Sequence, residues 1–411
     1  MIILQDSQIK KIFHNGDEVK KILDWDGNVI FYKQSGGGGM TNDIKFHTTS
    51  AATSSNVFTV TYADSTQDTV SYSEPSKEYS LSIPTDKVVN KIDFDYNDID
   101  EVSVSCKINL SKTLFTFEPK TIRIINCDAT SSTSIDHLFS DSSNVETIEM
   151  KDLDVRNATD MSYMFYKCME ATTIDISNWN TSSVTNLSNM FAYCMKLTSL
   201  NLSNFNTSNV TNMGDMFKNC RILTSLDLSC LNTSNVTNMS NMFYSCYGLT
   251  SLDVSHFNTS KVTRMSSMFG NCRILTTLDL SGFNTSNVTI MNFMFQGCSG
   301  LTSLNVSGWN TSKVTNMNDM FQDCSGITSL DLSGWDTSKV TDMGYMFVNC
   351  MNLTSLDLSG WDISKIRSKP RFMRCSKLKT IIMVGCNQET IDIIKSSLTS
   401  DGILDQVTII T

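Results

Sequence analysis

Apolar and polar residues follow one another along this chain in a pattern that returns every 26 residues. In the unit at 301–326, LTSLNVSGWNTSKVTNMNDMFQDCSG, the first six residues alternate with a period of two, which is typical of a half-buried strand. The later part of the unit has apolar residues at helical spacings, and they form one stripe: Val314, Met317, Met320, Phe321 and Cys324. We therefore expect each unit to be a strand, a bend and about two turns of helix, capped by Thr315 or Ser312.

Three columns of residues keep this period through eight successive units. The columns begin with the Met-Phe pair at Met164, the cysteine at Cys168 and the aromatic or leucine position at Trp179. No single unit can bury its own stripe, and stacking makes the core continuous. The pattern predicts an α/β repeat solenoid with a parallel strand ladder and short helices. At ~4.8 Å between strands, about eleven turns would extend roughly 50 Å.

The pattern changes on both sides of the repeats, which predicts further segments. Asn15-Gly16 and Asp26-Gly27 lie between alternating apolar residues and indicate hairpin turns, with three short strands in all. The last residues predict an amphipathic helix from about Asn387 and a final strand at 406–411. We predict a hairpin docking module at 1–34, a Gly-rich linker at 35–39, a small all-β domain at 40–119, the solenoid at 120–386 and a C-terminal cap at 387–411.

Two of these segments allow more than one interpretation. The strand-like runs at 57–62, 79–83 and 102–105 favour either a small sandwich or part of an N-terminal cap. Ser35 and the four glycines after it are typical both of a flexible linker and of a fusion junction.

The repeat LTSLDLSGWDTSKVTDMGYMFVNC resembles the BspA-like leucine-rich repeats of bacterial surface proteins, over about residues 120–385. That resemblance implies a right-handed horseshoe or stack, a role in adhesion or recognition, and no reaction. In this chain Phe, Trp or Leu occupies the usual inward asparagine position, so an asparagine ladder would have to come from Asn206 and its equivalents. The segment IKKIFHNGDEVKKILDWDGNVIFYK resembles the N-terminal modules of phage and prophage tail and appendage proteins. It implies docking on a virion.

Charge and composition narrow the classes of partner. A net charge of −10 disfavours nucleic acid, which needs clustered Lys and Arg, and also disfavours anionic membranes. No run of roughly 18 apolar residues is present, so we expect no membrane insertion. The start, MIILQDSQIKK, lacks the features of a signal peptide, and we expect no ordinary secretory export.

Residue types that often carry chemistry follow the repeat instead of gathering at one place. The four histidines, His14, His47, His137 and His256, are scattered, and no nucleophile or phosphate-loop motif is present. The cysteine and methionine columns share the apolar stripe, which favours core packing over metal binding, disulfides or a binding groove. The tryptophans hold an inward position, so burial is favoured over sugar stacking. We predict no enzyme, no catalytic residue, no metal site and no cofactor.

The best candidate for binding is the outward face of the predicted strands, where one column is polar in every unit. Its members are Asp175, Asn201, Asp227, Asp253, Asp279, Asn305, Asp331 and Asp357. Like charges ~5 Å apart repel by roughly 1 kcal/mol per pair in water, so serine hydroxyls, solvent, Ca²⁺ or a basic partner should offset them. A solvated face, a ligand-binding face and a Ca²⁺-binding face remain the alternatives.

Differences between the units indicate where specificity would lie. The residue before the aromatic column is Asn178, Asn204, Cys230 or His256 in the early units and glycine in the later ones. The pair after the cysteine also changes, for example from Arg221-Ile222 to Ser299-Gly300. N-x-S/T sequences such as that at 180–182 recur in every unit and are interpreted as turn chemistry.

Together these observations favour a non-catalytic accessory protein of a bacteriophage or prophage virion. Its N-terminal module would dock on other virion proteins, and its solenoid would recognise a host surface protein or glycan. A homo-oligomer is compatible with this hypothesis. The alternative is a bacterial or protist cell-surface or extracellular adhesin, and a structural role without a ligand is the third.

Overall fold

The computed structural model describes residues 42–48, 58–72, 74, 77–93, 99, 101–108, 110, 114, 119–125, 127–151 and 153–411, and the backbone of the strands at 11–15, 18–23, 29–31, 56–57 and 100. The chain divides into two units, 1–41 and 42–411. No helix in the described part of the chain has the length and apolar character needed to cross a bilayer.

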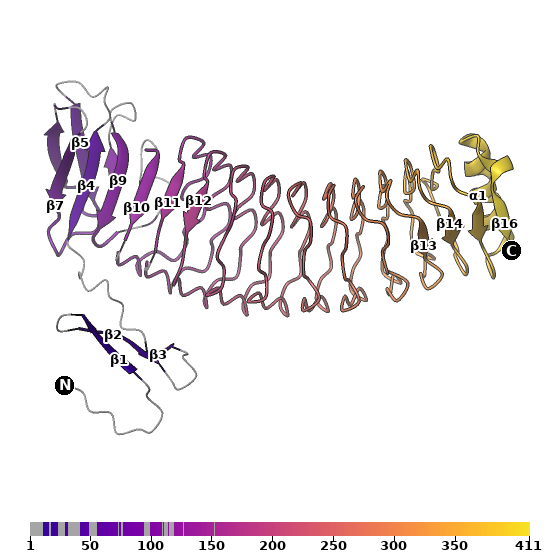
Figure 1. Cartoon of the computed structure of the whole chain (residues 1–411), viewed down its shortest axis with the longest axis horizontal. Coiled ribbons are helices and arrows are strands. Elements are labelled where there is room, and N and C mark those ends of the chain that lie inside the picture. The colour runs from indigo at the N-terminus through magenta and orange to yellow at the C-terminus, as the bar shows by residue number, and fades with distance from the viewer. Residues whose placement is uncertain are drawn as a thin grey trace. The chain divides into compact units, whose positions relative to one another are not determined.

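The first unit contains a three-stranded antiparallel sheet in the order β1–β2–β3 (Figure 1). Its strands are β1 (Lys11–Asn15), β2 (Glu18–Leu23) and β3 (Val29–Phe31), which confirms the three predicted strands. The turns predicted at Gly16 and at 26–27 and the linker predicted at 35–39 lie outside the described residues.

The second unit begins with six strands. They are β4 (Asp43–Thr48), β5 (Asn56–Tyr62), β6 (Gln67–Tyr72), β7 (Glu78–Ser82), β8 (Val89–Asp93) and β9 (Ile99–Ser105). One small sheet has the order β6–β5–β8, and its Phe58 ring stacks at 4.2 Å on Phe46 of β4. β4, β7 and β9 belong to a sheet that continues into the repeats, because β9 pairs in parallel with β10. These strands therefore cover the first open edge of the repeats.

The repeats form a β-solenoid of about 11 turns with parallel strand ladders and very little helix. Its early strands are β10 (Thr121–Ile124), β11 (Thr147–Glu149) and β12 (Thr173–Asp175), and its late strands are β13 (Ser329–Asp331), β14 (Ser355–Asp357), β15 (Thr380–Ile382) and β16 (Thr408–Ile410). Most neighbouring strands pair residues 26 apart, as Leu330 with Leu356, so the repeat period is the length of one turn. Figure 1 shows the turns following one another from β10 to β16.

The expected short helices in the repeats are wrong. In the unit at 301–326, Asp319 and Asp323 have positive φ angles of 55° and 59°, which a right-handed helix excludes. The N–H groups of Met317 and Phe321 donate to carbonyls of the next turn, at 2.9 and 3.1 Å, instead of to residues four earlier. Tight turns in this segment still bring every third or fourth side chain to the core, so their spacing imitates a helix.

The predicted helix caps change with this correction. The Thr315 hydroxyl donates to Thr289 O in the previous turn at 3.3 Å, and the Ser312 hydroxyl donates to Asn310 Oδ1 at 2.7 Å. Both groups thus connect or shape turns of the solenoid.

The apolar columns form the core as predicted. The Met-Phe pairs from Met164 onward and the repeat-column cysteines, which follow each pair and run from Cys168 to Cys350, are at most 1% exposed, and the tryptophans of the aromatic column are at most 4% exposed. Phenylalanine rings stack from turn to turn, for example Phe217 on Phe243 with centroids 5.8 Å apart.

The C-terminal end is covered by α1 (Gln388–Ser400), the short 3-10 helix η1 (Leu404–Gln406) and β16, which confirms the predicted final helix and strand. The side chain of Asn387 caps α1 by accepting the N–H of Thr390 at 2.8 Å. The buried Asp401 carboxylate accepts the N–H of Phe372 at 2.6 Å and pairs with Arg371. It therefore satisfies backbone and side-chain donors of the last turn.

Candidate functional site on the outer strand face

The eight polar residues of the candidate column hold one position of the repeat on the outside of the strands. Asp331 pairs with Asp357 across β13 and β14, and Asp175 holds the same position in β12. Asp175 and Asp357 are half-buried and the six others are exposed. The structure thus brings the predicted residues into one outward column.

Each side chain of this column is held by a serine two residues later. Asp253 Oδ1 accepts the backbone N–H of Ser255 at 3.0 Å and its hydroxyl at 2.7 Å. Asp331 makes the same pair of bonds with Ser333. These turns are formed by the short Asp or Asn side chain itself, so a local backbone conformation fixes the carboxylate.

The serine donors also keep the column negatively charged. They hold the pKa values of the Asp227, Asp253 and Asp279 carboxyls below the ordinary range. The negative charge of Asp253 raises the pKa of Asp279, but the hydrogen bonds from Ser281 lower it by more. The serine groups therefore offset part of the repulsion between neighbouring charges of the column.

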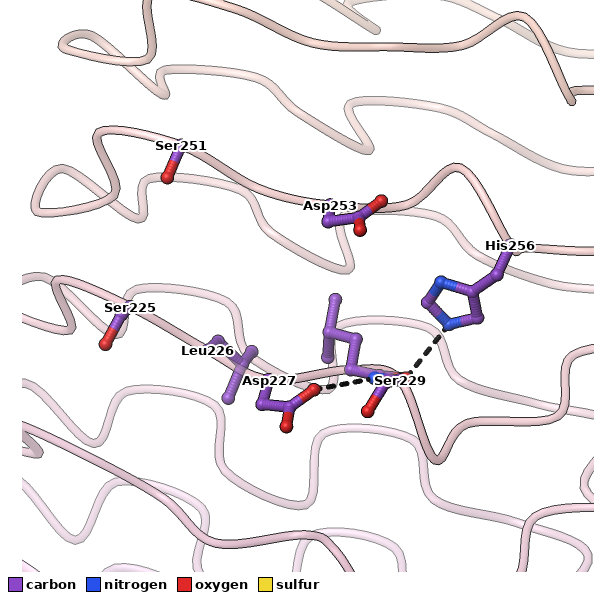
Figure 2. A pocket seen from close by; sticks show the side chains of 8 residues that line it. Ser225, Leu226, Asp227, Ser229, Ser251, Asp253 and His256 are labelled. Carbon is purple, nitrogen blue, oxygen red and sulfur yellow. Dashed lines mark hydrogen bonds between the residues drawn. The ribbon is translucent and has the colours of Figure 1, made fainter.

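One hollow interrupts this face, and Figure 2 shows the side chains that line it. They are Ser225, Leu226, Asp227, Leu228, Ser229, Ser251, Asp253 and His256. His256 Nε2 lies 2.9 Å from Leu228 O, and the imidazole faces both carboxylates closely enough to lower their pKa values.

This hollow offers two carboxylates, several hydroxyls and one imidazole. Such a set can accept hydrogen bonds from a cationic group, and it can both accept hydrogen bonds from and donate them to a hydroxyl-rich group. Within the described residues, no three His, Cys, Asp or Glu side chains are grouped so that they could hold a metal ion.

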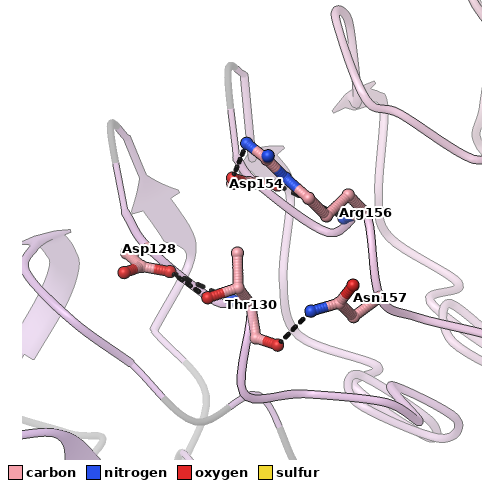
Figure 3. A network of polar contacts seen from close by, with 5 residues as sticks. All are labelled: Asp128, Thr130, Asp154, Arg156 and Asn157. Carbon is pink, nitrogen blue, oxygen red and sulfur yellow. Dashed lines mark hydrogen bonds and ion pairs between the residues drawn. The ribbon is translucent and has the colours of Figure 1, made fainter.

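The corner that follows the aromatic column is closed by polar side chains. Figure 3 shows its first turns, where Asp128 accepts the N–H and hydroxyl of Thr130, and Asp154 pairs with Arg156. Asn157 Nδ2 donates to Thr130 O at 2.9 Å and connects the two turns. From residue 180 onward the N-T-S sequences build the same corner, which confirms their interpretation as turn chemistry.

A family described as "Mycoplasma protein of unknown function, DUF285" matches the chain in five overlapping stretches, at residues 88–173, 133–226, 168–277, 222–304 and 275–382. The chain belongs to this family. No curated relative matches it. The matched stretches cover the solenoid from β9 to β15, so the outer face and its hollow lie within the DUF285 repeats.

The cysteines of the DUF285 repeats do more than fill space. All thirteen cysteines carry free thiols, and those of the repeat column donate to a phenylalanine carbonyl in the previous turn, as Cys194 does to Phe165 O at 3.2 Å. Burial raises the pKa of the Cys272 thiol to about 12, so the thiol keeps its proton. The column thus acts as a set of protonated hydrogen-bond donors.

Two further columns were missed in the sequence. The first is a column of seven buried threonines, one in each turn from Thr181 to Thr337. The Thr181 hydroxyl accepts the N–H of Asn206 in the next turn and donates to the C=O of the same residue. Asn206 itself forms a turn within its own unit, whereas Asn238 Nδ2 donates to Asn212 Oδ1 at 3.0 Å. Contacts between asparagines of neighbouring turns are therefore found at 212 and 238 and at 178 and 204, and not at Asn206 and its equivalents. The regular Thr in every N-T-S sequence was the available signal.

Proposed function

We propose that this chain is a non-catalytic binding protein and that its outer strand face recognises a partner. The observation that carries the proposal is the column from Asp175 to Asp357, in which each short side chain is already oriented. A preorganised side chain loses little conformational freedom on binding, so its contacts contribute more to affinity. The hollow at Asp227, Asp253 and His256 is the centre of this proposed site.

We further propose that the protein is an accessory component of a bacteriophage or prophage virion. In this proposal residues 1–34 dock on other virion proteins, and the solenoid contacts a host surface protein or glycan. The small sheet β1–β3 supports the docking role, because its strands have only three to six residues and packing on a partner surface would add to their stability. The proposal includes neither nucleic acid, membrane insertion nor a cofactor.

The second candidate is a cell-surface adhesin with BspA-like repeats. It is supported by the family match, because the family description names a cellular organism. Fractionation of the source culture distinguishes the two candidates. We expect the full chain to sediment with phage particles after lysis, and finding it on intact cells without particles would favour the adhesin.

The strand face is tested by a matched pair of double variants of the full chain. Asp227→Asn/Asp253→Asn removes two charges beside the hollow. Asp336→Asn/Asp362→Asn removes two from another corner, where each carboxylate likewise accepts from a serine two residues later. Asparagine keeps these turns in both variants.

Binding to an array of bacterial and animal surface glycans, and to intact host cells, is the measurement. We expect the first variant to lose about tenfold in affinity, as for removal of charged hydrogen bonds, and the second to bind like the parent chain. Equal binding by all three proteins would rule out the hollow as the binding site.

A further inference from the structure

A second surface lies on the corner just after the cysteine column, away from the candidate site. There Tyr247 lies between two arginines that come from the turn before it and the turn after it. The guanidinium carbon of Arg221 is 5.7 Å from the centre of the Tyr247 ring, and that of Arg273 is 5.0 Å from it. Stacking on one ring holds both guanidinium groups in place.

Neither arginine has an ion pair with a described residue, whereas Lys196 at the same corner pairs with Glu170 at 2.5 Å. Arg221 and Arg273 are both exposed. They therefore present two unneutralised positive charges on a chain whose net charge is −10.

The next residue of each turn adds apolar surface beside these charges. Ile222 and Ile274 are 45% and 46% exposed, which is unusual for isoleucine, and Gly248 lies between them. A Cβ on Gly248 would come within 2.8 Å of Leu223 O, so this position stays bare. The two exposed isoleucines thus flank a position that has no side chain.

We propose that the surface formed by residues 221–222, 247–248 and 273–274 binds an extended acidic segment of a partner protein. Charge complementarity requires carboxylates, which guanidinium groups bind in a bidentate manner. The two exposed isoleucines favour an apolar peptide side chain over a sugar.

The spacing of the turns defines the segment more closely. Two turns of a strand ladder separate the arginines by about 10 Å. A segment in the extended polyproline II conformation covers about 9 Å in three residues and returns its side chains to the same face at every third residue, whereas a β-strand alternates its faces. The matching segment therefore has two Asp or Glu residues three positions apart, with an apolar residue between them that contacts Ile222 or Ile274. This proposal does not depend on the strand face or on a virion role.

The test uses the full chain and an array of 12-residue synthetic peptides, each with two aspartates separated by zero to five residues and with either leucine or serine between them. We expect binding to be strongest when two residues, one of them leucine, separate the aspartates. Replacing both aspartates by asparagine should abolish binding. No preference for any separation, or equal binding of the asparagine peptides, overturns the proposal.

Two double variants locate the site on the chain. Arg221→Gln/Arg273→Gln should weaken the best peptide about tenfold or more, because both charged contacts are lost. Arg264→Gln/Arg367→Gln removes two exposed arginines elsewhere on the solenoid and should leave binding unchanged. Circular dichroism confirms that both variants keep the fold.

Two more outcomes count against the proposal. Equal loss in both double variants would mean that overall charge, not this surface, attracts the peptides. Binding of a sulfated glycan such as heparin more tightly than any peptide, lost in Arg221→Gln/Arg273→Gln, would mean that the surface takes a polyanionic sugar. Either result would overturn the proposal that an acidic protein segment binds this surface.

Discussion

Two regions of the solenoid supply a donor to an equivalent backbone carbonyl in different ways. The late turns contain Trp335 and Trp361, and the middle turns contain Cys230 and His256. In the late turns the indole N–H donates from inside the core, from Trp335 to Val306 O at 2.9 Å and from Trp361 to Leu332 O at 3.0 Å. In the middle turns the residue before the column reaches the equivalent carbonyl from outside, with Cys230 Sγ 3.0 Å from Leu202 O and His256 Nε2 2.9 Å from Leu228 O.

The comparison teaches that different residues supply the second donor to equivalent carbonyls in different turns. Gly334 precedes Trp335, and a Cβ there would collide with Ser307 O, so this turn has no room for an outside donor. In the middle turns the column residues are Leu231 and Phe257, which have no N–H in their side chains. His256, one of the outside donors, also lines the hollow beside Asp227.

The largest expected effect comes from imposing the middle arrangement on a late turn. Trp335→Leu removes a side chain that is 2% exposed, together with its hydrogen bond, and should destabilise the protein by about 3 kcal/mol through cavity formation. The midpoint of urea unfolding, followed by circular dichroism, measures this. Gly334→Cys/Trp335→Leu copies the pair at 230–231 and should recover nothing, because of the collision at Ser307. Recovery of most of the lost stability would show that the two arrangements are interchangeable.

A second expected effect concerns the segment just before the column cysteine, which also differs between middle and late turns. In a middle turn Asp215 pairs with Lys218 at 2.8 Å, whereas in a late turn the equivalent residues are Asp319 and Gln322. Burial, and then the charges of Asp342 and Asp323, raise the pKa of Asp319 to about 6 from an ordinary 3.8. The native chain therefore binds more protons than the unfolded chain between about pH 4 and 6, so stability falls as the pH rises through this window.

Asp319→Asn should remove this pH dependence and stabilise the protein by about 1–2 kcal/mol at pH 7, less than the full shift because solvent screens a turn. Gln322→Lys restores the lysine of the middle turn and should act in the same direction. Urea unfolding at pH 4, 5, 6 and 7 gives both results. Unchanged pH dependence in Asp319→Asn would assign the effect to another group.

Much of the fold could be predicted from the sequence because its signals repeat. The 26-residue period located the turns, and the inward columns at Met164, Cys168 and Trp179 identified the core. The outward column from Asp175 to Asp357 was likewise visible, because a strand alternates its faces.

The conformation of the turns could not be predicted from the apolar spacing. A spacing of three and four is shared by a helix and by successive tight turns, and the chain selects turns because their N–H groups can bond to the next unit. The residue before each cysteine carried a weak signal, since Asn219, Asn271, Asp323 and Asn349 are of the types that tolerate positive φ. The hollow at His256 and the stacked Tyr247 depend on contacts between units, which one unit's sequence does not contain.

The smallest expected effect isolates the indole hydrogen bond itself. Trp309 and Trp335 occupy equivalent positions and stack with centroids 6.3 Å apart, but Trp309 Nε1 has no partner among the described residues. Trp→Phe removes the same atoms at either position. Trp335→Phe should therefore cost about 1 kcal/mol more than Trp309→Phe, because only the first leaves a buried carbonyl without its second donor. Differential scanning calorimetry and urea unfolding of the two variants measure the difference. If both substitutions cost the same, the second donor contributes nothing to stability.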